Sequence, residues 1–295
     1  MRLYSWLKQQ AKIVRWQWRR YKAVQKWGSS AANEVPAIVG NAIPKCGSHL
    51  IIQVLQGLVH LGPFVNPGFP PLNRSEDNRK LADEQVVKRI RQLRSGDIAY
   101  GYIQARSPFL EWFNGTPKDS TRRLMVFIYR DPRDYVISHV FYATQINKDH
   151  GLHRYYTQTL HTMEERINAA ILGVEESNET DSALSSVVKK YENYLGWFSE
   201  PAVLCLKFED LILEREKVLH VFLDYLARNG FSPKASRADA VNVLSQAIIP
   251  KASGTFRRAK PGNWQEHFSE ENKKLFKQAA GDLLLLLGYE KDDQW

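Results

Sequence analysis

Cysteine is scarce in this sequence of 295 residues, in which only Cys46 and Cys205 are present. Two cysteines cannot form the disulfide network of a small secreted domain, so we expect a reduced intracellular chain. The longest leucine run, Leu283–Leu287, is far shorter than the roughly 20 apolar residues of a membrane-spanning helix. The N-terminus also lacks the continuous apolar segment of a secretory signal. These absences predict a cytoplasmic protein.

Acidic residues are absent from residues 1–27, which contain eight lysines and arginines. The whole chain has 41 basic and 32 acidic residues, so the part after residue 27 holds 33 basic and 32 acidic ones. A nucleic-acid-binding domain usually carries its positive excess on the folded body, because neutralising phosphates drives its affinity. The nearly neutral body therefore argues against a nucleic-acid partner.

Residues 1–30 are expected to form a basic amphipathic N-terminal helix outside the main domain. At about 100° per residue, one face carries the apolar side chains Leu3, Trp6, Leu7, Ile13, Val14, Trp18, Tyr21 and Val24. The opposite face carries Lys8, Lys12, Arg15, Arg19, Lys22 and Lys26. Such a helix either packs on the protein's own body with its basic face in solvent, or lies at an anionic membrane surface. Residues 1–27 are therefore a candidate for peripheral membrane contact.

From residue 31 onward, strands are expected to alternate with helices. Short apolar segments predict strands at Pro36–Ile43, Asp97–Gln104, Arg123–Arg130 and Ala202–Phe208. Helices are predicted at Leu50–His60, Ser75–Arg94, Pro132–Thr144, Tyr155–Val174, Ala183–Phe198, 211–229, 236–247 and Glu270–Gly288. This order favours one α/β domain over residues 31–295, a P-loop-like three-layer sandwich with a central, mainly parallel sheet flanked by helices. Ligands of such sheets bind at the carboxyl ends of the strands.

A glycine-containing turn joins the first predicted strand to its helix. A strand, a tight turn and a helix N-terminus together can hold an anion with backbone N–H groups. Gly47 allows close approach, Ser48 adds a hydroxyl donor and Lys45 adds a positive charge. Nucleoside triphosphatases place their lysine after the second glycine, whereas Lys45 precedes the glycine here. The turn therefore predicts an anion site of another kind, or an ordinary strand-to-helix connection.

A second candidate anion site follows the third predicted strand, in Arg130-Asp131-Pro132-Arg133-Asp134. An arginine at the carboxyl end of a strand can bind a phosphate through two N–H groups, and Ser138 can reach the same group from the next helix. Alternatively, Arg130 and Asp134 form a structural salt bridge. Neither interpretation is decided by these residues alone.

In combination, these segments resemble the PAPS-dependent sulfotransferases, where PAPS is 3′-phosphoadenosine 5′-phosphosulfate. Pro44-Lys45-Cys46-Gly47-Ser48-His49-Leu50 resembles the family's loop for the 5′-phosphosulfate, P-K-S-G-(S/T)-x-(L/W), with Cys46 in place of serine. The segment from Arg130 to Ser138 resembles the family's 3′-phosphate site. Phe208-Glu209-Asp210-Leu211 resembles the element (Y/F)-E-D-(L/M). The resemblance extends over about residues 36–288.

The C-terminal segment Phe256–Trp264 resembles the family's R-K-G-x-x-G-D-W loop, which closes over the 3′-phosphate. Arg257 and Arg258 match the basic pair, whereas Ala259 and Asn263 replace a glycine and an aspartate. The resemblance implies a metal-independent enzyme that moves a sulfuryl group from PAPS to a hydroxyl or amine of a small-molecule acceptor. The implied cofactor-binding residues are Lys45, Cys46, Gly47, Ser48, His49, Leu50, Arg130, Ser138, Phe208, Phe256, Arg257 and Arg258.

Catalysis is implied for Lys45, Ser138 and the residue that removes the acceptor's proton. Lys45 would hold the 5′-phosphate and neutralise charge on the leaving oxygen. The family commonly uses a histidine after the second strand, where this chain has Tyr102. A tyrosine with an ordinary pKa of about 10 is a poor base near neutrality. Other candidate bases are His139, His150, His153 and Glu111.

Two other functions remain as alternatives to sulfuryl transfer. A P-loop kinase would use Arg123–Asp131 as its metal-holding strand. A non-catalytic nucleotide-binding protein would keep the fold and act at a membrane or partner surface through its basic helix. The family's dimer motif is absent around Gln265–Lys274, so the sequence assigns no oligomeric state.

Overall fold

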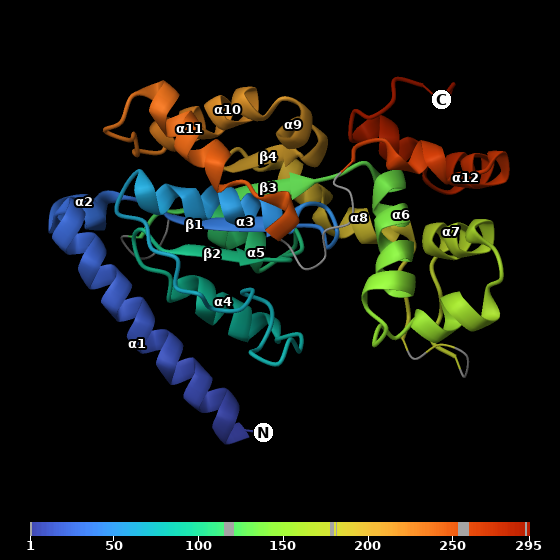
Figure 1. Cartoon of the computed structure of the whole chain (residues 1–295), viewed down its shortest axis with the longest axis horizontal. Coiled ribbons are helices and arrows are strands. Elements are labelled where there is room, and N and C mark those ends of the chain that lie inside the picture. Colours follow the sequence, from blue (N-terminus) through green and yellow to red (C-terminus); the bar gives the residue numbers. More distant parts are fainter. Residues whose placement is uncertain (1, 115–120, 178–179, 181, 253–259, 293) are drawn as a thin grey trace. The chain divides into compact units, whose positions relative to one another are not determined.

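The computed structural model describes residues 2–114, 121–177, 180, 182–252, 260–292 and 294–295, and they belong to two compact units (Figure 1). Unit 1 comprises Met1–Tyr129 and Gly196–Ala252, and unit 2 comprises Arg130–Leu195 and Ser253–Trp295. Among the helices so described, none combines the length and the apolar character that a membrane span requires.

Unit 1 is built on four parallel strands in the order β2-β1-β3-β4. The strands are β1 (Ala37–Ala42), β2 (Ile98–Gly101), β3 (Arg123–Tyr129) and β4 (Val203–Lys207). The two central strands, β1 and β3, are buried along their whole length. Continuous apolar strands of this kind are expected where helices cover both faces of a parallel sheet. The predicted α/β class is confirmed.

Unit 1 has helices before, between and after its strands along the chain. They are α1 (Arg2–Trp27), α2 (Ser29–Glu34), α3 (Ser48–Gly57), α4 (Asp83–Arg91), α5 (Phe109–Asn114), α9 (Phe208–Leu213), α10 (Arg215–Arg228) and α11 (Arg237–Ala247). Short 3₁₀ helices are η1 (Leu58–His60), η4 (Gly196–Ser199) and η5 (Pro250–Ala252). Helix α3 packs on β1, and α11 packs on α3.

Two neighbouring residues of β1 show how the two faces of the sheet are covered. Gly40 faces α3, and a Cβ atom there would lie 3.0 Å from Leu55 Cδ1. Asn41 points to the opposite face, since successive strand residues alternate. Its amide donates to the Ile103 carbonyl at 2.9 Å and accepts from the Ile103 N–H at 2.7 Å. The Trp197 Nε1–H also donates to the Ile103 carbonyl at 2.9 Å, so this face holds the chain that leaves β2.

The prediction of a helix from Ser75 to Arg94 is wrong in its first part, because α4 begins only at Asp83. Residues 75–79 form a turn in which the Ser75 N–H donates to the Arg79 carbonyl at 2.9 Å. The Ser75 hydroxyl accepts from the Arg79 N–H at 3.0 Å, and Asn78 adopts a left-handed φ of 61°. Short polar side chains that bond to their own backbone compete with helix formation.

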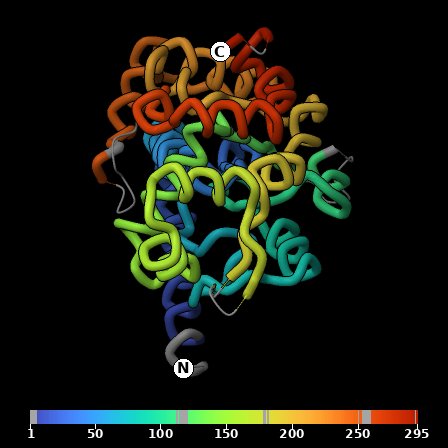
Figure 2. Tube along the Cα trace, turned by 90° about the vertical axis from the view of Figure 1, so that its right-hand side faces the viewer, coloured from blue at the N-terminus to red at the C-terminus, as the bar shows by residue number. Residues whose placement is uncertain are grey.

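Helix α1 packs on unit 1 through part of its basic face. Trp16 Nε1–H and Arg20 Nη1 both donate to Asp97 Oδ1, at 2.8 Å and 3.0 Å. Lys12 Nζ forms an ion pair with Glu76 Oε2 at 2.5 Å. The expectation of a basic face in solvent is wrong for Lys12, because the half-buried Glu76 on the body compensates its charge. Arg20, which does not belong to the predicted basic face, pairs in the same way with the buried Asp97. Figures 1 and 2 show the N-terminal turns of α1 projecting away from the other helices of unit 1.

Unit 2 is helical in the residues that the structure describes. Its helices are α6 (Pro132–Phe141), α7 (Met163–Leu172), α8 (Val187–Leu195) and α12 (Glu270–Leu286), with the π-helical turns η2 (Tyr142–Ile146) and η3 (Tyr155–Thr159) and the 3₁₀ helix η6 (Asn263–Glu266). Helix α7 packs against both α6 and α12. The fully buried Asn272 of α12 donates to the Glu164 carbonyl at 3.1 Å and to Asn168 Oδ1 at 2.8 Å.

The single helix predicted from Tyr155 to Val174 is divided into η3 and α7. Thr162 begins α7 with a capping box: its hydroxyl accepts from the Glu165 N–H at 3.1 Å, and Glu165 Oε2 accepts from the Thr162 N–H at 2.9 Å. The sequence T-x-x-E is the usual signature of such a helix start. The helical periodicity concealed this boundary.

Candidate active site

The turn between β1 and α3 is the candidate anion site of unit 1. Lys45 adopts a left-handed backbone conformation with φ 72°, which residues other than glycine rarely do, and Gly47 has φ 96°. Such strain persists where the surrounding structure enforces it, often at functional sites. Ser48 and His49 open α3, where the helix supplies no acceptor for their N–H groups. These N–H groups are suited to an anion.

Gly47 is required for space as well as for its positive φ. A Cβ atom at this position would lie 2.6 Å from Phe208 Cδ2 and 3.1 Å from Ile128 Cδ1. Phe208 is buried and is the first residue of α9, directly after β4. The structure thus brings the predicted site residue Phe208 against the loop, where its ring packs beneath Gly47 and shapes the turn.

Two predicted loop residues direct their side chains into the core. Cys46 is fully buried, and its N–H donates to the Ile43 carbonyl at 3.0 Å. Leu50 is buried as well, and its N–H donates to the Gly47 carbonyl at 2.9 Å. The cysteine that replaces the family's serine therefore lies on the inner side of the loop, away from the donors at Ser48 and His49.

Burial lowers two pKa values in the loop, those of Lys45 and His49. Desolvation lowers the pKa of Lys45 from 10.5 to about 7. Desolvation and then repulsion by Lys45 lower the pKa of His49. An anion bound here would favour the protonated lysine and reverse part of this shift. The loop therefore has a cation whose charge depends on what binds beside it.

Tyr102, the predicted base, lies at this loop. Its hydroxyl is 3.4 Å from the Ser48 hydroxyl. Its backbone is held by Asn73, which accepts from the Tyr102 N–H at 3.1 Å and donates to the Tyr102 carbonyl at 2.9 Å. The sequence did not single out Asn73, although it lies in a loop rich in proline, glycine and asparagine, where such side chains often bind backbone. Glu111, another candidate base, accepts from the Ser107 hydroxyl at 2.5 Å.

The three candidate histidines lie together in unit 2. The rings of His139 and His150 have centroids 5.4 Å apart, and His139 lies 5.8 Å from the Tyr156 ring. His153 Nδ1 is 2.8 Å from the Ala143 carbonyl. The rings of His139, His150 and Tyr156 thus pack on one another around α6 and the π-helical turns, whereas His153 contacts backbone.

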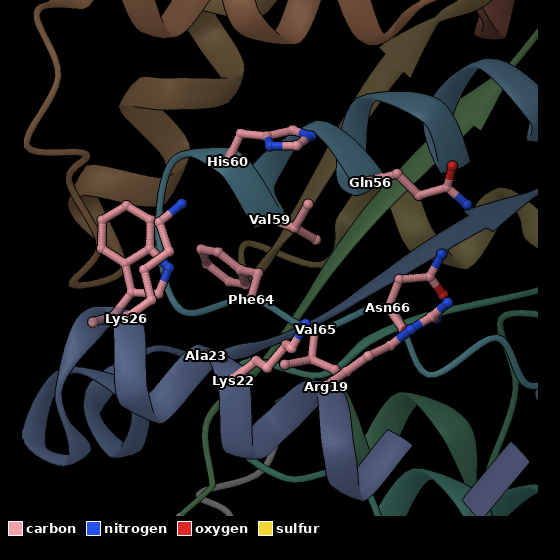
Figure 3. A pocket seen from close by; sticks show the side chains of 11 residues that line it. Arg19, Lys22, Ala23, Lys26, Gln56, Val59, His60, Phe64, Val65 and Asn66 are labelled. Carbon is pink, nitrogen blue, oxygen red and sulfur yellow. The ribbon is translucent and has the colours of Figure 1, made fainter. Parts of the chain in front are cut away.

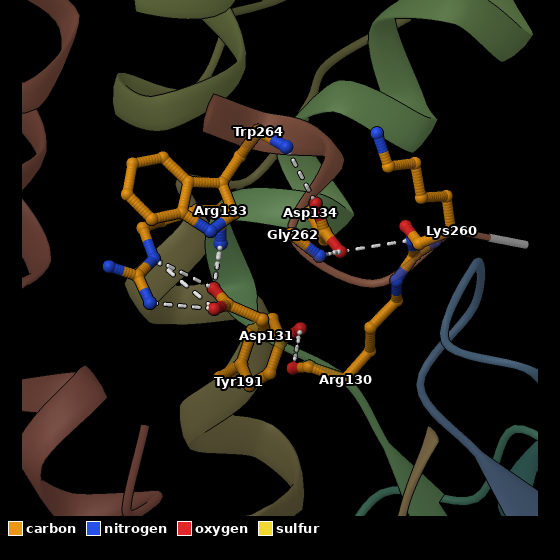
Figure 4. Close-up of polar contacts among 8 residues, drawn as sticks. All are labelled: Arg130, Asp131, Arg133, Asp134, Tyr191, Lys260, Gly262 and Trp264. Atoms are coloured by element: carbon orange, nitrogen blue, oxygen red, sulfur yellow. Dashed lines mark hydrogen bonds and ion pairs between the residues drawn. The ribbon is translucent and has the colours of Figure 1, made fainter. Parts of the chain in front are cut away.

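Arg130 is the centre of the candidate anion site of unit 2 (Figure 4). Its Nη2 donates to Asp134 Oδ2 at 3.1 Å and to the Lys260 carbonyl at 3.3 Å. Its own carbonyl accepts from the Tyr191 hydroxyl at 2.8 Å. The salt bridge considered as the structural alternative is thus present, and it also holds the guanidinium in place.

Asp134 attaches the C-terminal loop to this site. Its carboxylate accepts from the Gly262 N–H at 3.0 Å and from the Trp264 N–H at 2.8 Å (Figure 4). Burial raises the pKa of Asp134, although Arg130 and these two donors favour its charged form. Local sequence patterns do not reveal this role of Asp134. Of the other predicted residues, Ser138 is half-buried on α6, whereas Phe256, Arg257 and Arg258 lie outside the described residues.

Arg133 has a structural role beside this site. Its Nε and Nη2 bind the two oxygens of Asp131 at 3.0 Å and 2.7 Å. Its guanidinium carbon lies 4.0 Å from the Trp264 ring centroid and 4.4 Å from the Trp295 ring centroid. This stacking and the bidentate pair fix the end of the C-terminal loop.

Several solved structures share this fold. Mouse sulfotransferase SULT7A1 complexed with PAP is 15% identical, with a TM-score of 0.55 over 88% of this chain and 93% of that one. Retinol dehydratase with androsterone and the inactive cofactor PAP is 13% identical, with a TM-score of 0.52 over 89% and 85%. Retinol dehydratase with retinol and PAP is 14% identical, with a TM-score of 0.51 over 86% and 84%. Identities this low show similarity of fold.

Sequence comparison is more specific about the family. No curated protein matches the chain at a significant level. The family model described as the sulfotransferase domain matches residues 38–287, which include the β1–α3 loop, the Arg130 segment and the C-terminal loop. Because this match covers most of the chain, the protein belongs to the sulfotransferase domain family.

Proposed function

We propose that the chain transfers the sulfuryl group of PAPS to a hydroxyl or amine of a small-molecule acceptor. The observation that carries the proposal is the β1–α3 loop, in which a desolvated Lys45 precedes the open N-terminus of α3 in a member of the sulfotransferase family. The similar solved structures contain PAP, the nucleotide that remains after PAPS has given up its sulfuryl group. Family membership also favours sulfuryl transfer over the kinase alternative.

The loop residues fit the 5′ end of such a nucleotide. Bound PAPS supplies the sulfuryl group and a nucleotide leaving group. Lys45 supplies a cation, Ser48 and His49 supply N–H donors at a helix N-terminus, and Gly47 leaves room for close approach. We assign to Lys45 the neutralisation of negative charge that develops on the leaving oxygen. Cys46 and Leu50 then contribute through the backbone shape of the loop, because their side chains are buried.

We assign to Tyr102 the role of the group that receives the proton of the acceptor's hydroxyl or amine. Its hydroxyl lies 3.4 Å from Ser48, and Asn73 fixes its backbone on both sides. A hydroxyl in this position can accept a hydrogen bond from the acceptor group and orient it for attack. Replacement by phenylalanine removes this group with little change in volume.

We propose that the 3′-phosphate is bound by Arg130, Ser138, Arg257 and Arg258. The support is that Arg130 is preorganised by Asp134, which also holds the loop that follows the two C-terminal arginines in the sequence. A guanidinium held in one orientation loses less entropy on binding a phosphate. We further propose residues 31–295 as the sulfotransferase domain, with residues 1–30 as an appended element.

Helix α1 is proposed to make peripheral contact with an anionic membrane surface. The face of α1 turned away from the body carries an apolar row with exposed fractions of 51–65%: Leu7, Val14, Trp18 and Tyr21. Beside this row, one or two turns apart, lie the exposed cations Lys8, Arg15, Lys22 and Lys26. Aromatic and aliphatic side chains next to lysine and arginine are typical of helices at a lipid interface.

Single-turnover transfer from radiolabelled PAPS to a panel of alcohols and amines tests the enzymatic function. Product is expected with the parent chain, a rate lower by about 10²–10⁴-fold with Tyr102→Phe, and unchanged transfer with Lys80→Ala, an exposed lysine outside the loop. Tight PAP binding without product from any acceptor would instead support the non-catalytic alternative.

Thermal stabilisation by nucleotides tests the assignment of the 3′-phosphate site. PAP at about 100 times its Kd should stabilise the parent chain by ~2.7 kcal/mol. Arg130→Ala should remove this stabilisation. ADP, which lacks the 3′-phosphate, should stabilise the parent chain much less, and equal stabilisation by ADP would contradict the assignment.

A further inference from the structure

A cavity of about 460 Å³ lies in unit 1 between α1 and the chain that follows α3 (Figure 3). None of the described residues that line it is an aspartate or a glutamate. Its volume is in the range of small-molecule sites, which begins at about 300 Å³. The lining residues that matter are Arg19, Lys22 and Lys26 of α1, Gln56 of α3, His60 of η1, and Phe64.

The α1 side of the cavity concentrates positive charge. Arg19 Nη1 donates to the Asn66 carbonyl at 2.5 Å, which fixes the guanidinium at the cavity wall. Lys22 Nζ lies 3.7 Å from the centroid of the Trp18 ring, and Lys26 Nζ lies 4.6 Å from that of Trp27. Within the described part of the chain, neither lysine forms an ion pair with a carboxylate. Three cations close together without a counter-charge favour an anionic ligand.

The opposite side of the cavity contains apolar side chains. Phe64 packs edge to face on Phe231, with ring centroids 4.7 Å apart. Val59 and Val65 lie next to it (Figure 3). Gln56 adds an amide at the edge, which can donate to an oxygen of a ligand. A ligand that satisfies both sides has an anionic group and an organic body.

This cavity is separate from the Lys45 loop. Helix α3 begins at Ser48, beside the loop, and His60 lies twelve residues later at the end of η1. At 1.5 Å per residue this separation is on the order of 18 Å along the helix. The sulfuryl-transfer proposal therefore leaves these cations unexplained.

We propose that the cavity binds a phosphate ester, with the phosphate against Arg19, Lys22 and Lys26 and the organic part against Phe64. An arginine and two lysines suit a phosphate, whose several oxygens accept charge-assisted hydrogen bonds. The ester belongs either to the headgroup of a membrane phospholipid or to a soluble molecule. The inference does not depend on sulfuryl transfer, and its lipid form rests on the proposed membrane contact of α1.

Two binding measurements on the full chain distinguish the two sources. The first is co-sedimentation with vesicles of phosphatidylglycerol and phosphatidylcholine, compared with phosphatidylcholine alone. The second is calorimetric titration with glycerol 3-phosphate and with inorganic phosphate. Binding to the anionic vesicles alone assigns the site to lipid headgroups, and binding of glycerol 3-phosphate alone assigns it to soluble esters. Binding of neither overturns the proposal.

A matched pair of double variants separates a specific cavity from general attraction. Lys22→Gln with Lys26→Gln removes two cavity cations and should weaken binding roughly tenfold or more, because the charge-assisted hydrogen bonds of both ammonium groups to the phosphate are lost. Lys8→Gln with Arg15→Gln removes the same charge from exposed positions of the same helix that do not line the cavity, and should change binding much less. Equal losses in the two variants would overturn the proposal in favour of non-specific attraction.

Gln56→Glu provides a second test that leaves α1 unchanged. It places a carboxylate at the cavity edge with almost no change in size, so binding of the phosphate ester should be abolished. Circular dichroism should show an unchanged fold. Undiminished binding by this variant would show that the ligand lies elsewhere. The binding measurements with vesicles, glycerol 3-phosphate and inorganic phosphate do not involve PAPS. Their results are therefore independent of whether the chain transfers a sulfuryl group.

Discussion

The two candidate anion sites treat positive charge in opposite ways. In unit 1, burial lowers the pKa of Lys45 to about 7, so part of its charge is lost near neutrality. In unit 2, Arg130 is paired with Asp134, and Arg133 is paired with Asp131. An arginine keeps its proton at any physiological pH, and the carboxylates hold it in position. An anion bound in unit 1 would therefore restore the charge of its lysine, whereas the arginine in unit 2 is charged and oriented before any anion binds.

Removal of the organising carboxylate should have the largest effect. Asp134→Ala leaves Arg130 without its ion-pair partner and leaves the N–H groups of Gly262 and Trp264 without their acceptor. Because the pair is buried, the free energy of unfolding should fall by about 3–5 kcal/mol. Denaturant titration measures this free energy. The control is Asp224→Ala, which breaks the exposed pair with Arg237 and should change the free energy of unfolding by less than about 1 kcal/mol. Similar losses in both variants would contradict the organising role.

A methyl group at position 47 should disturb the other site nearly as much. Gly47→Ala places a Cβ atom 2.6 Å from Phe208 and forces alanine to adopt φ 96°. Strain and crowding together should cost about 2–4 kcal/mol of unfolding free energy and abolish PAP binding. Gly281→Ala is the control, since a Cβ atom there meets nothing within 4 Å. A stable Gly47→Ala chain that binds PAP would refute this account of the loop.

Proton uptake sharpens the comparison between lysine and arginine. At pH 8, most Lys45 side chains of the free protein are neutral, because the pKa of Lys45 is about 7. A bound anion should raise this pKa. PAP binding at pH 8 should therefore be accompanied by uptake of nearly one proton. Affinity should therefore fall as the pH rises from about 7 to 9. Calorimetry in buffers of different ionisation enthalpy measures the uptake. Lys45→Arg stays charged and should lose this uptake.

The same lowered pKa affects the stability of the nucleotide-free protein. Between about pH 7 and 10.5 the unfolded chain keeps a proton on Lys45 that the folded chain has released. Stability rises with pH wherever the unfolded state binds more protons. This contribution should be absent in Lys45→Arg, and a pH profile of unfolding that is identical for both chains would contradict the shift.

The smallest effect is expected at the residue that departs from the family pattern. Cys46→Ser restores the family's serine, but the side chain at this position is fully buried. PAP affinity should change by less than about threefold, whereas burial of a hydroxyl should cost about 1–2 kcal/mol of stability. Titration with PAP and denaturant unfolding check both values. A large gain in affinity would show that the serine hydroxyl reaches the ligand.

The sheet, and the positions of the two candidate anion loops beside it, could be predicted from the sequence because both depend on local patterns. Apolar runs identify buried strands, and Lys45, Gly47 and Arg130 stand at strand ends where the chain must turn. The role of Asp134 could not be found in this way, since the N–H groups that it accepts from belong to residues 262 and 264, far along the chain. Long-range pairs of this kind leave no periodic signal.

The N-terminal helix was predicted as a helix, but its docked face was not. Periodicity separates apolar from basic side chains, and it led to the expectation of a solvated basic face. In the folded chain, Trp16 and Arg20 share Asp97, and Lys12 pairs with Glu76, so specific partners decide which side packs. The partners of charged side chains depend on tertiary structure, which periodicity does not contain.

The contact of Arg133 with two indole rings has a practical consequence for protein engineering. Trp295 covers Arg133 and also meets the Phe276 ring, with centroids 6.0 Å apart. A label or a bulky substituent introduced at position 295 would displace a side chain that is packed in unit 2. Replacement of Trp295 by alanine would uncover the Arg133 guanidinium on one side.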